Sequence, residues 1–252
     1  MPEKTRTAGA LTALGRWTGR ALDLVYPRNC QFCSTPLDES ERGVICASCL
    51  AQAKRIEAPY CSRCSLPFDG KIDAEFVCSY CTDLKFHFTR AVAACQSVGL
   101  VRDCIHRFKY NREMYYLPHL ASWLIDASQE RIDWSTVDAI VPVPLHPVKQ
   151  RSREFNQAEL LARELSRKFQ KPVVKNGIRR AKPTVTQTRL DAHARRENLR
   201  NAFAPGRVRM DASRVVLIDD VFTTGATLDS CAKVLLAQGA ADIIALTVAR
   251  GV

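Results

Sequence analysis

The stretch VVLIDDVFTTGAT, residues 215–227, decides the fold of this 252-residue chain. Its first four residues form a continuous apolar run, which is typical of a parallel strand covered on both faces. Two adjacent carboxylates, Asp219 and Asp220, end that run, and a small, hydroxyl-rich loop then leads into a predicted helix. In open α/β sheets a ligand binds beyond the carboxyl ends of the strands. The stretch therefore predicts an α/β protein with a ligand site at this turn.

The loop at residues 223–227 has the composition of a phosphate site. Backbone N–H groups, hydroxyls and the dipole of the following helix all attract anionic oxygens, and Gly225 lets the backbone approach a ligand closely. Asp219 and Asp220 would repel a phosphate, but they can hold vicinal hydroxyls or the water shell of a metal ion. A helix cap would explain one Asp or Thr, not this whole set. A phosphorylated ribose offers both a phosphate and a diol, so we expect one to bind here.

Strands and helices alternate on both sides of this stretch. Hydrophobic periodicity predicts strands at 90–95, 137–143, 173–174, 215–218 and 242–249, and helices at 115–129, 156–169 and 226–238. The alternation predicts a mostly parallel sheet flanked by helices. The polar, arginine-rich segment 183–203 shows little periodicity, and we expect it to form either a mobile basic lid over the site or a surface loop.

Eight of the eleven cysteines form four Cys-x-x-Cys pairs. They are Cys30, Cys33, Cys46, Cys49, Cys61, Cys64, Cys78 and Cys81. Two such pairs can supply the four thiolates of a tetrahedral Zn²⁺ site, so four pairs predict two structural zinc sites. Redox or iron–sulfur chemistry is the alternative. Turn residues follow Cys33 and Cys64, as in a zinc ribbon.

The spacing of the pairs leaves two arrangements open. Consecutive pairs would each close a short hairpin with a low entropy cost, and we favour that arrangement. A cross-brace would instead join the first pair to the third. The other cysteines, Cys95, Cys104 and Cys231, are expected to be small buried residues rather than nucleophiles.

The N-terminal segment 1–27 is predicted to form an amphipathic helix at about residues 8–25. Arg16 and Arg20 break its apolar stretch, so it does not resemble a signal peptide. No window of 18 apolar residues occurs, and we expect a cytoplasmic protein without a membrane span.

The formal net charge of +11 is concentrated in the second half of the chain, where residues 149–209 hold 17 basic and 5 acidic side chains. This excess indicates either an anionic partner, such as a phosphorylated small molecule or a nucleic acid, or a solvated basic surface.

Residues 215–227 resemble the phosphoribosyl-pyrophosphate (PRPP) motif of type I phosphoribosyltransferases. The chain from about Leu24 to Val252 resembles the ComF (ComFC/GntX) family, in which a double zinc ribbon precedes a phosphoribosyltransferase-like domain. Four further stretches are similar to that family, namely RFKY (107–110), VPVPLHP (141–147), RSREFNQAELLA (151–162) and the segment 184–203. Glu154 departs from the pattern, which has a small residue, usually Gly, at this position.

The resemblance implies domains at 28–84, the double zinc ribbon, and at 85–252, the phosphoribosyltransferase-like domain. Asp219 and Asp220 would hold the ribose hydroxyls as the catalytic pair. The 5′-phosphate would be bound by Thr223, Thr224, Gly225, Ala226 and Thr227. Leu145 and His146 would face the pyrophosphate, which binds with Mg²⁺. The charge of the pyrophosphate would be neutralised by Lys109, Arg153, Arg195 or Arg196.

Two functions from different classes follow. The first is a phosphoribosyltransferase, in which pyrophosphate leaves the anomeric carbon of PRPP and a nitrogen acceptor of unknown identity takes its place. The second is a DNA-handling protein whose PRPP site senses a nucleotide or is vestigial, and whose basic segment binds single-stranded DNA. The resemblance favours a role in DNA uptake, natural transformation or use of external DNA, with DNA-uptake or recombination proteins as partners. Trp17, Trp123 and Trp134 are scattered and are expected to pack rather than stack on bases.

Overall fold

The computed structural model describes residues 28–38, 41, 43–72, 74–145, 154–181 and 202–251. The chain divides into two compact units, residues 1–52 and residues 53–252. The expected helix at 8–25 and residues 183–201 of the arginine-rich segment lie outside the described residues. Among the residues that are described, no helix combines the length and the hydrophobicity needed to cross a bilayer.

The larger unit is built on a parallel sheet with the strand order β1-β6-β5-β2. The strands are β1 (Arg90–Gln96), β6 (Asp242–Arg250), β5 (Arg214–Phe222) and β2 (Ala139–Pro142). The apolar run Val215–Ile218 is buried in the middle of β5, between β6 and β2. The sheet confirms the mostly parallel α/β fold, because a central strand needs apolar side chains on both faces.

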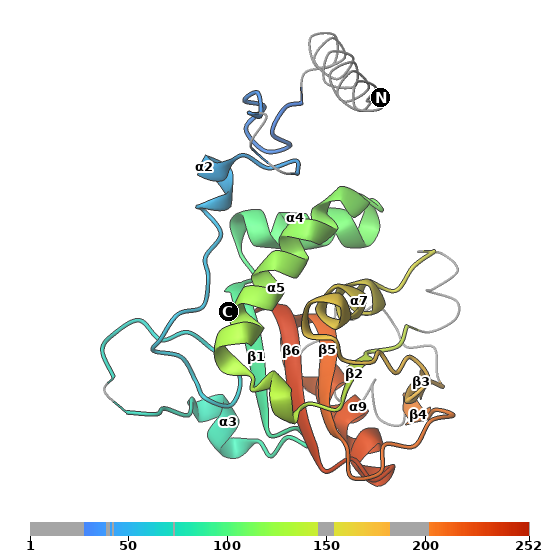
Figure 1. The fold of residues 1–252 in the computed structure, drawn as a ribbon. Helices are drawn as coiled ribbons and strands as arrows, with labels where there is room; N and C mark the ends of the chain where they lie inside the picture. Colours follow the sequence, from blue (N-terminus) through green and yellow to red (C-terminus); the bar gives the residue numbers. More distant parts are fainter. Residues whose placement is uncertain are drawn as a thin grey trace, which may run out of the picture. The chain divides into compact units, whose positions relative to one another are not determined.

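Helices cover both faces of this sheet. They are α4 (Gly99–Tyr110), α5 (Leu117–Arg131), α7 (Gln157–Phe169) and α9 (Ala226–Ala237), with the short 3-10 turns η1 (Met114–Tyr116) and η2 (Trp134–Thr136). Helices α5 and α7 lie on one face, and α9 lies against the other (Figure 1). The side chain of Asn156 caps α7 by accepting a hydrogen bond from the amide of Ala158.

Two elements differ from the sequence-based expectation. Helix α4 was not predicted, although its buried residues Val101, Cys104, Ile105 and Phe108 follow helical spacing. Strand β5 does not end before the acids but continues through Asp219 and Asp220 to Phe222. The reason is that β6 is equally long, so Asp219 pairs with Thr247 and Phe222 pairs with Arg250.

Both edges of the sheet are covered. On the β1 side, the amides of Ile56 and Ala91 bond to the carbonyls of Ala94 and Arg63. On the β2 side, the expected strand at 173–174 is reduced to a single parallel bridge between Ile140 and Val173. A separate hairpin of β3 (Ile178–Arg180) and β4 (Phe203–Pro205) flanks the arginine-rich segment.

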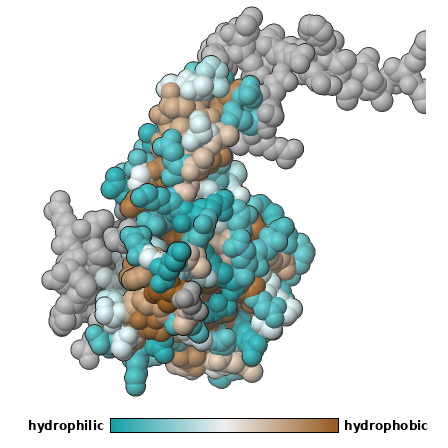
Figure 2. Space-filling model, turned by 90° about the vertical axis from the view of Figure 1, so that its left-hand side faces the viewer, coloured by the Kyte–Doolittle hydropathy of each residue, from teal (hydrophilic) through white to brown (hydrophobic). Residues whose placement is uncertain are grey.

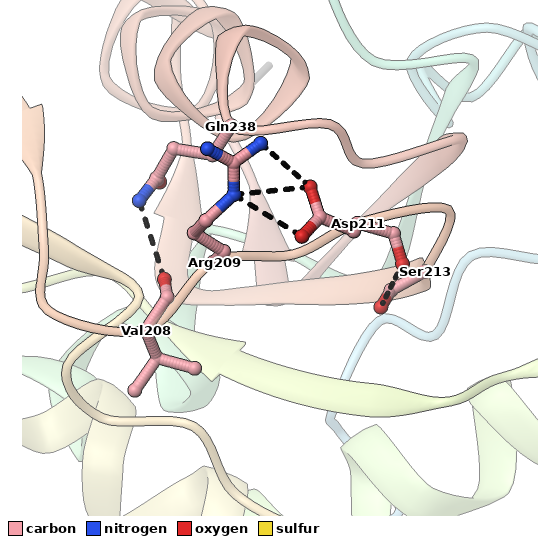
Figure 3. A network of polar contacts seen from close by, with 5 residues as sticks. All are labelled: Val208, Arg209, Asp211, Ser213 and Gln238. Atoms are coloured by element: carbon pink, nitrogen blue, oxygen red, sulfur yellow. Dashed lines mark hydrogen bonds and ion pairs between the residues drawn. The ribbon is translucent and has the colours of Figure 1, made fainter.

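A polar network fixes the loop that leads into β5 (Figure 3). The guanidinium of Arg209 donates to both carboxylate oxygens of Asp211, at 2.9–3.2 Å, and Gln238 donates to the carbonyl of Val208 at 3.2 Å. Gly239 ends α9 in the left-handed conformation, with a φ of 98°. The loop and the end of α9 are thus joined at the amino end of β5, opposite the turn that follows it.

The two units each contain one short cysteine-bearing helix. The smaller unit contains α2 (Ala47–Leu50), and the larger contains α3 (Ser79–Asp83). The second cysteine-rich ribbon therefore belongs to the same compact unit as the sheet.

Figure 2 looks onto the side of the molecule that carries this ribbon. It shows hydrophobic residues gathered within a mostly hydrophilic surface. Phe68 and Val77 are exposed hydrophobic residues of this ribbon.

Candidate functional site

The turn after β5 lies at the carboxyl rim of the sheet. Strand β5 ends at Phe222 and α9 begins at Ala226, so residues 223–227, here called the phosphate loop, join the two elements. Thr223 is exposed, Thr224 and Thr227 are half-buried, and the hydroxyl of Thr224 accepts a hydrogen bond from the amide of Ala226 at 3.4 Å. The hydroxyl-rich loop thus opens at the amino end of a helix, where an anion is stabilised.

Gly225 is required by the shape of this loop. It has a φ of 74°, and a Cβ atom there would lie 2.7 Å from Cζ of Phe222 and 2.9 Å from Cε1 of Phe86. The loop backbone is therefore pressed against two aromatic rings, and no larger residue fits without moving them.

Gly225→Ala is expected to destabilise the larger unit by about 2–4 kcal/mol, since a left-handed alanine costs about 1–2 kcal/mol and overpacking adds a similar amount. Gly99→Ala is the matched control, because Gly99 is also left-handed, with a φ of 46°, and has nothing within 4 Å of the added Cβ. Denaturant unfolding of both variants measures the difference. Equal losses of stability would show that the aromatic rings do not constrain the loop.

The two acids meet a lysine from α4. The Nζ atom of Lys109 lies 2.5 Å from Oδ2 of Asp220, and both side chains are largely buried. Burial and the neighbouring Asp220 raise the pKa of Asp219 to about 7, and the charge of Lys109 partly offsets them. Burial lowers the pKa of Lys109, but Asp220 and Asp219 more than compensate, so its pKa is raised. Lys109 therefore stays protonated beside Asp220 at the rim.

The other residues that the sequence assigns to the site divide into two groups. Leu145 is half-buried and lies three residues after the end of β2 at Pro142. The amide of Val143, the first residue after β2, donates a hydrogen bond to the carbonyl of Ile218, the residue before Asp219. Leu145 therefore lies at the same rim of the sheet as Asp219. His146, Arg153, Arg195 and Arg196 lie outside the described residues.

Glu154 occupies a left-handed position, with a φ of 68°. Its carboxylate is paired with the guanidinium of Arg112 at 2.7 Å. This backbone conformation favours glycine, which is the residue that the family pattern has there. Glu154 therefore combines a backbone conformation typical of glycine with a charged side chain.

The eight paired cysteines form two clusters. One holds Cys30, Cys33, Cys46 and Cys49, the other holds Cys61, Cys64, Cys78 and Cys81, and within each cluster the ligand atoms lie within 4.8 Å of one another. The consecutive arrangement is confirmed, and the cross-brace is not adopted.

Both clusters fit Zn²⁺. The Sγ atoms of Cys33 and Cys46 are 3.5 Å apart and those of Cys64 and Cys78 are 3.7 Å apart, close to the roughly 3.8 Å that tetrahedral Zn–S bonds of about 2.3 Å require. The amides of Cys46 and Cys78 donate to the sulfurs of Cys30 and Cys61. Four thiols with no oxygen donor form a closed, structural kind of zinc site.

The remaining cysteines are buried, as predicted. Burial raises the pKa of the Cys95 and Cys104 thiols to about 12 and raises that of Cys231 as well. These side chains therefore remain neutral thiols, not nucleophiles. Trp123 and Trp134 are also buried, and Trp134 stacks on Phe169.

Sequence reasoning missed two residues that hold the phosphate loop. Tyr80 donates its hydroxyl to the carbonyl of Thr224 at 2.9 Å, and Arg250 donates to the carbonyl of Thr223 at 2.8 Å. The only local signal for Tyr80 is its place between Cys78 and Cys81, and Arg250 is simply the last residue of β6.

The parallel sheet with its flanking helices and the two cysteine clusters define an α/β protein with a double zinc ribbon. A family model described as the double zinc ribbon domain matches residues 21–85. The chain is 32% identical to competence protein F of Haemophilus influenzae over 226 residues, which cover 88% of this chain and 96% of that protein. The chain belongs to the ComF family.

Two further relatives also match most of the chain. The DNA utilization protein YhgH of Escherichia coli K12 is 30% identical and matches 87% of this chain and 96% of its own length. Competence protein ComFC of Bacillus subtilis is 27% identical and matches 82% of this chain and 84% of its own length. Among solved structures, the glutamine PRPP amidotransferase of B. subtilis complexed with ADP and GMP has a TM-score of 0.39 and 15% identity, and the match covers 56% of this chain and 30% of that chain.

Proposed function

We propose that this chain binds PRPP with Mg²⁺ at the phosphate loop and transfers the phosphoribosyl group to a nitrogen acceptor. The observation that carries the proposal is the arrangement at the end of β5. Two acids and the protonated Lys109 lie at the rim immediately before a glycine-bent, threonine-rich loop at the start of α9. A diol-binding pair next to an anion-binding loop suits a phosphorylated ribose.

Each part of this arrangement has a proposed role. The amides and hydroxyls of residues 223–227 bind the 5′-phosphate, and Asp219 and Asp220 accept hydrogen bonds from the ribose hydroxyls. A bound diol competes with Lys109 for Asp220, which frees the amine to pair with the pyrophosphate. Mg²⁺ would add neutralising charge on the pyrophosphate oxygens.

The proposed reaction is a displacement at the anomeric carbon. Pyrophosphate leaves with the electron pair of the broken C–O bond, and the acceptor nitrogen forms the new C–N bond and loses its proton. Rate acceleration would come from positioning and from neutralising the leaving group. In this proposal Leu145 and His146 face the pyrophosphate, and Arg153, Arg195 and Arg196 supply further positive charge.

Calorimetric titration with PRPP and Mg²⁺ tests this function. The wild-type protein should bind PRPP more tightly than ribose 5-phosphate or pyrophosphate alone, because only PRPP engages both halves of the site. No heat of binding with any of the three would refute the proposed site.

The second candidate function is single-stranded DNA handling in the cytoplasm, linked to DNA uptake or use. The relatives are named competence and DNA utilization proteins, and residues 149–209 carry the basic excess. Within the described part of that segment, however, Arg163, Arg167 and Lys175 each pair with a glutamate of α7. Their charges are partly neutralised, so these three residues are weaker candidates for a DNA contact than Arg195 and Arg196 of the arginine-rich segment, which we propose for it.

This DNA contact predicts a specific pattern of variants. Arg195→Gln/Arg196→Gln should weaken single-stranded DNA binding and reduce the slope of log affinity against log salt by about 1–2, because each phosphate contact on a single strand contributes about 0.7. Arg163→Gln/Arg167→Gln makes the same charge change on α7 and should have a smaller effect. A salt-independent affinity, or equal losses in both variants, would contradict this assignment.

A further inference from the structure

The second cysteine ribbon lies directly against the phosphate loop. Tyr80, which lies between the zinc ligands Cys78 and Cys81, donates its hydroxyl to the carbonyl of Thr224 at 2.9 Å. The segment that follows the ribbon also contacts the start of α9. The amide and the Nδ1 atom of His87 lie 2.6 and 3.0 Å from Oδ1 of Asp229, in the first turn of that helix.

An aromatic cluster fills the space behind the loop. Phe86 stacks on Phe88, with ring centroids 4.6 Å apart, and both rings meet Phe222 edge to face. Phe86 and Phe222 are also the rings that leave no room for a side chain at Gly225. The segment after the ribbon therefore shapes the loop as well as touching it.

Arg250 joins the loop to the cluster itself. Its Nη1 atom donates to the carbonyls of Phe222 at 3.3 Å and Thr223 at 2.8 Å, and also to that of Gly251. Its Nη2 atom lies 4.0 Å from Sγ of Cys64, and the guanidinium lies over the ring of Phe222. One side chain thus contacts both a zinc ligand and the first carbonyls of the phosphate loop.

The buried charge of Arg250 favours a negatively charged group beside it. The residue is 6% exposed, and among the described residues no carboxylate pairs with it. A buried guanidinium without a negatively charged partner is costly, even where carbonyls accept its hydrogen bonds. A cluster of four thiolates around Zn²⁺ carries a formal charge of −2, so the loaded cluster supplies the missing negative charge beside the guanidinium.

We propose that Arg250 and Tyr80 are positioning residues through which the zinc-loaded second cluster holds the backbone of the phosphate loop in its anion-binding shape. The coupling to PRPP rests on the proposed function. The effect of the two residues on the shape of the loop does not depend on it. Coupling between two sites is reciprocal. Zinc in the second cluster strengthens PRPP binding, and bound PRPP slows the release of that zinc.

Hydrogen exchange at the amides of residues 223–227 tests the mechanical part without any ligand. Tyr80→Phe removes one hydroxyl and should speed exchange there about two- to tenfold, the range expected for one hydrogen bond. Tyr60→Phe makes the same change in the same ribbon, at a ring that lies against Arg131 instead, and should leave the loop unchanged. Arg250→Met should have a larger effect, and if it fails to fold, Tyr80→Phe decides.

Zinc release to a chelating dye tests the reciprocal part. In the full chain carrying Cys46→Ser, the remaining zinc belongs to the second cluster, and PRPP with Mg²⁺ should slow its release about fivefold or more. In the chain carrying Cys78→Ser, the remaining zinc belongs to the first cluster, and PRPP should not change its release. Adding Tyr80→Phe to the Cys46→Ser chain should reduce the slowing, which a merely structural role of the tyrosine would not do.

The hydrogen-exchange and zinc-release experiments distinguish a failure of the proposed function from a failure of this inference. If the wild-type protein does not bind PRPP, the proposed function fails, and the exchange comparison alone decides the positioning role. If PRPP binds but slows zinc release equally from both clusters or from neither, the coupling is refuted. Unchanged exchange at residues 223–227 in both Tyr80→Phe and Arg250→Met overturns the inference in every case.

Discussion

Asp219→Asn/Asp220→Asn should lower the affinity for PRPP with Mg²⁺ by about 100-fold or more. The physical reason is the charge of the acceptors. Hydrogen bonds to charged groups contribute about 1.5–3 kcal/mol each, and every 1.4 kcal/mol is about a factor of ten in affinity. Asparagine keeps the shape of the side chain but not the carboxylate, so the ribose hydroxyls lose both charged acceptors.

The same variant should bind pyrophosphate at least as well as the wild-type protein. It removes the charge of Asp220 and the partial charge of Asp219, whose pKa is raised to about 7, and it frees Lys109, which in the wild-type protein is paired with Asp220. Opposite responses to PRPP and pyrophosphate would separate loss of the diol contacts from general damage to the site. Calorimetry with both ligands makes the comparison.

Asp211→Asn is the control for this experiment. Asp211 is exposed, pairs with Arg209, and lies before the amino end of β5 (Figure 3). Its replacement should leave PRPP affinity unchanged. Wild-type affinity in the double variant, or an equal loss in Asp211→Asn, would contradict the assignment of the two acids.

Removing the metal from the first cluster should unfold residues 28–52 completely. Apart from its cysteines, the described part of this unit buries a single apolar side chain, that of Ile45. So small a core does not offset the entropy of ordering the chain, and metal binding must supply the folding free energy. Cys46→Ser should therefore reduce the zinc content from two ions to one and abolish the hydrogen-exchange protection of residues 28–52.

The larger unit should be unaffected by this substitution, because the first cluster belongs to a separate compact unit. Cys104→Ser is the matched control, since Cys104 is a buried cysteine outside both clusters and its replacement should leave two zinc ions bound. Persistent protection of residues 28–52 in Cys46→Ser would show that the unit folds without its metal.

Much of the fold was predictable because its signals are local. The apolar run Val215–Ile218 and the amphipathic pattern of residues 156–169 each depend on neighbours within a few positions. Helix α4 shows how such a signal is lost. Its apolar positions follow helical spacing, but the helix begins at Gly99, a poor helix former, and no capping side chain marks its start.

The sequence alone determined which residues make up the cysteine clusters and the proposed phosphate loop. The Cys-x-x-Cys spacing determined the zinc clusters, and residues 215–227 determined the phosphate loop, since in both cases the relevant atoms lie close together along the chain. Only the tertiary structure decided what those sites touch. Lys109 reaches Asp220, Tyr80 reaches a carbonyl 144 residues away, and Arg250 lies beside a sulfur 186 residues away. Such contacts leave no pattern in the sequence, because they depend on which strands become neighbours in the sheet. They also depend on burial, since a buried charge is stable only beside an opposite charge or hydrogen-bond partners.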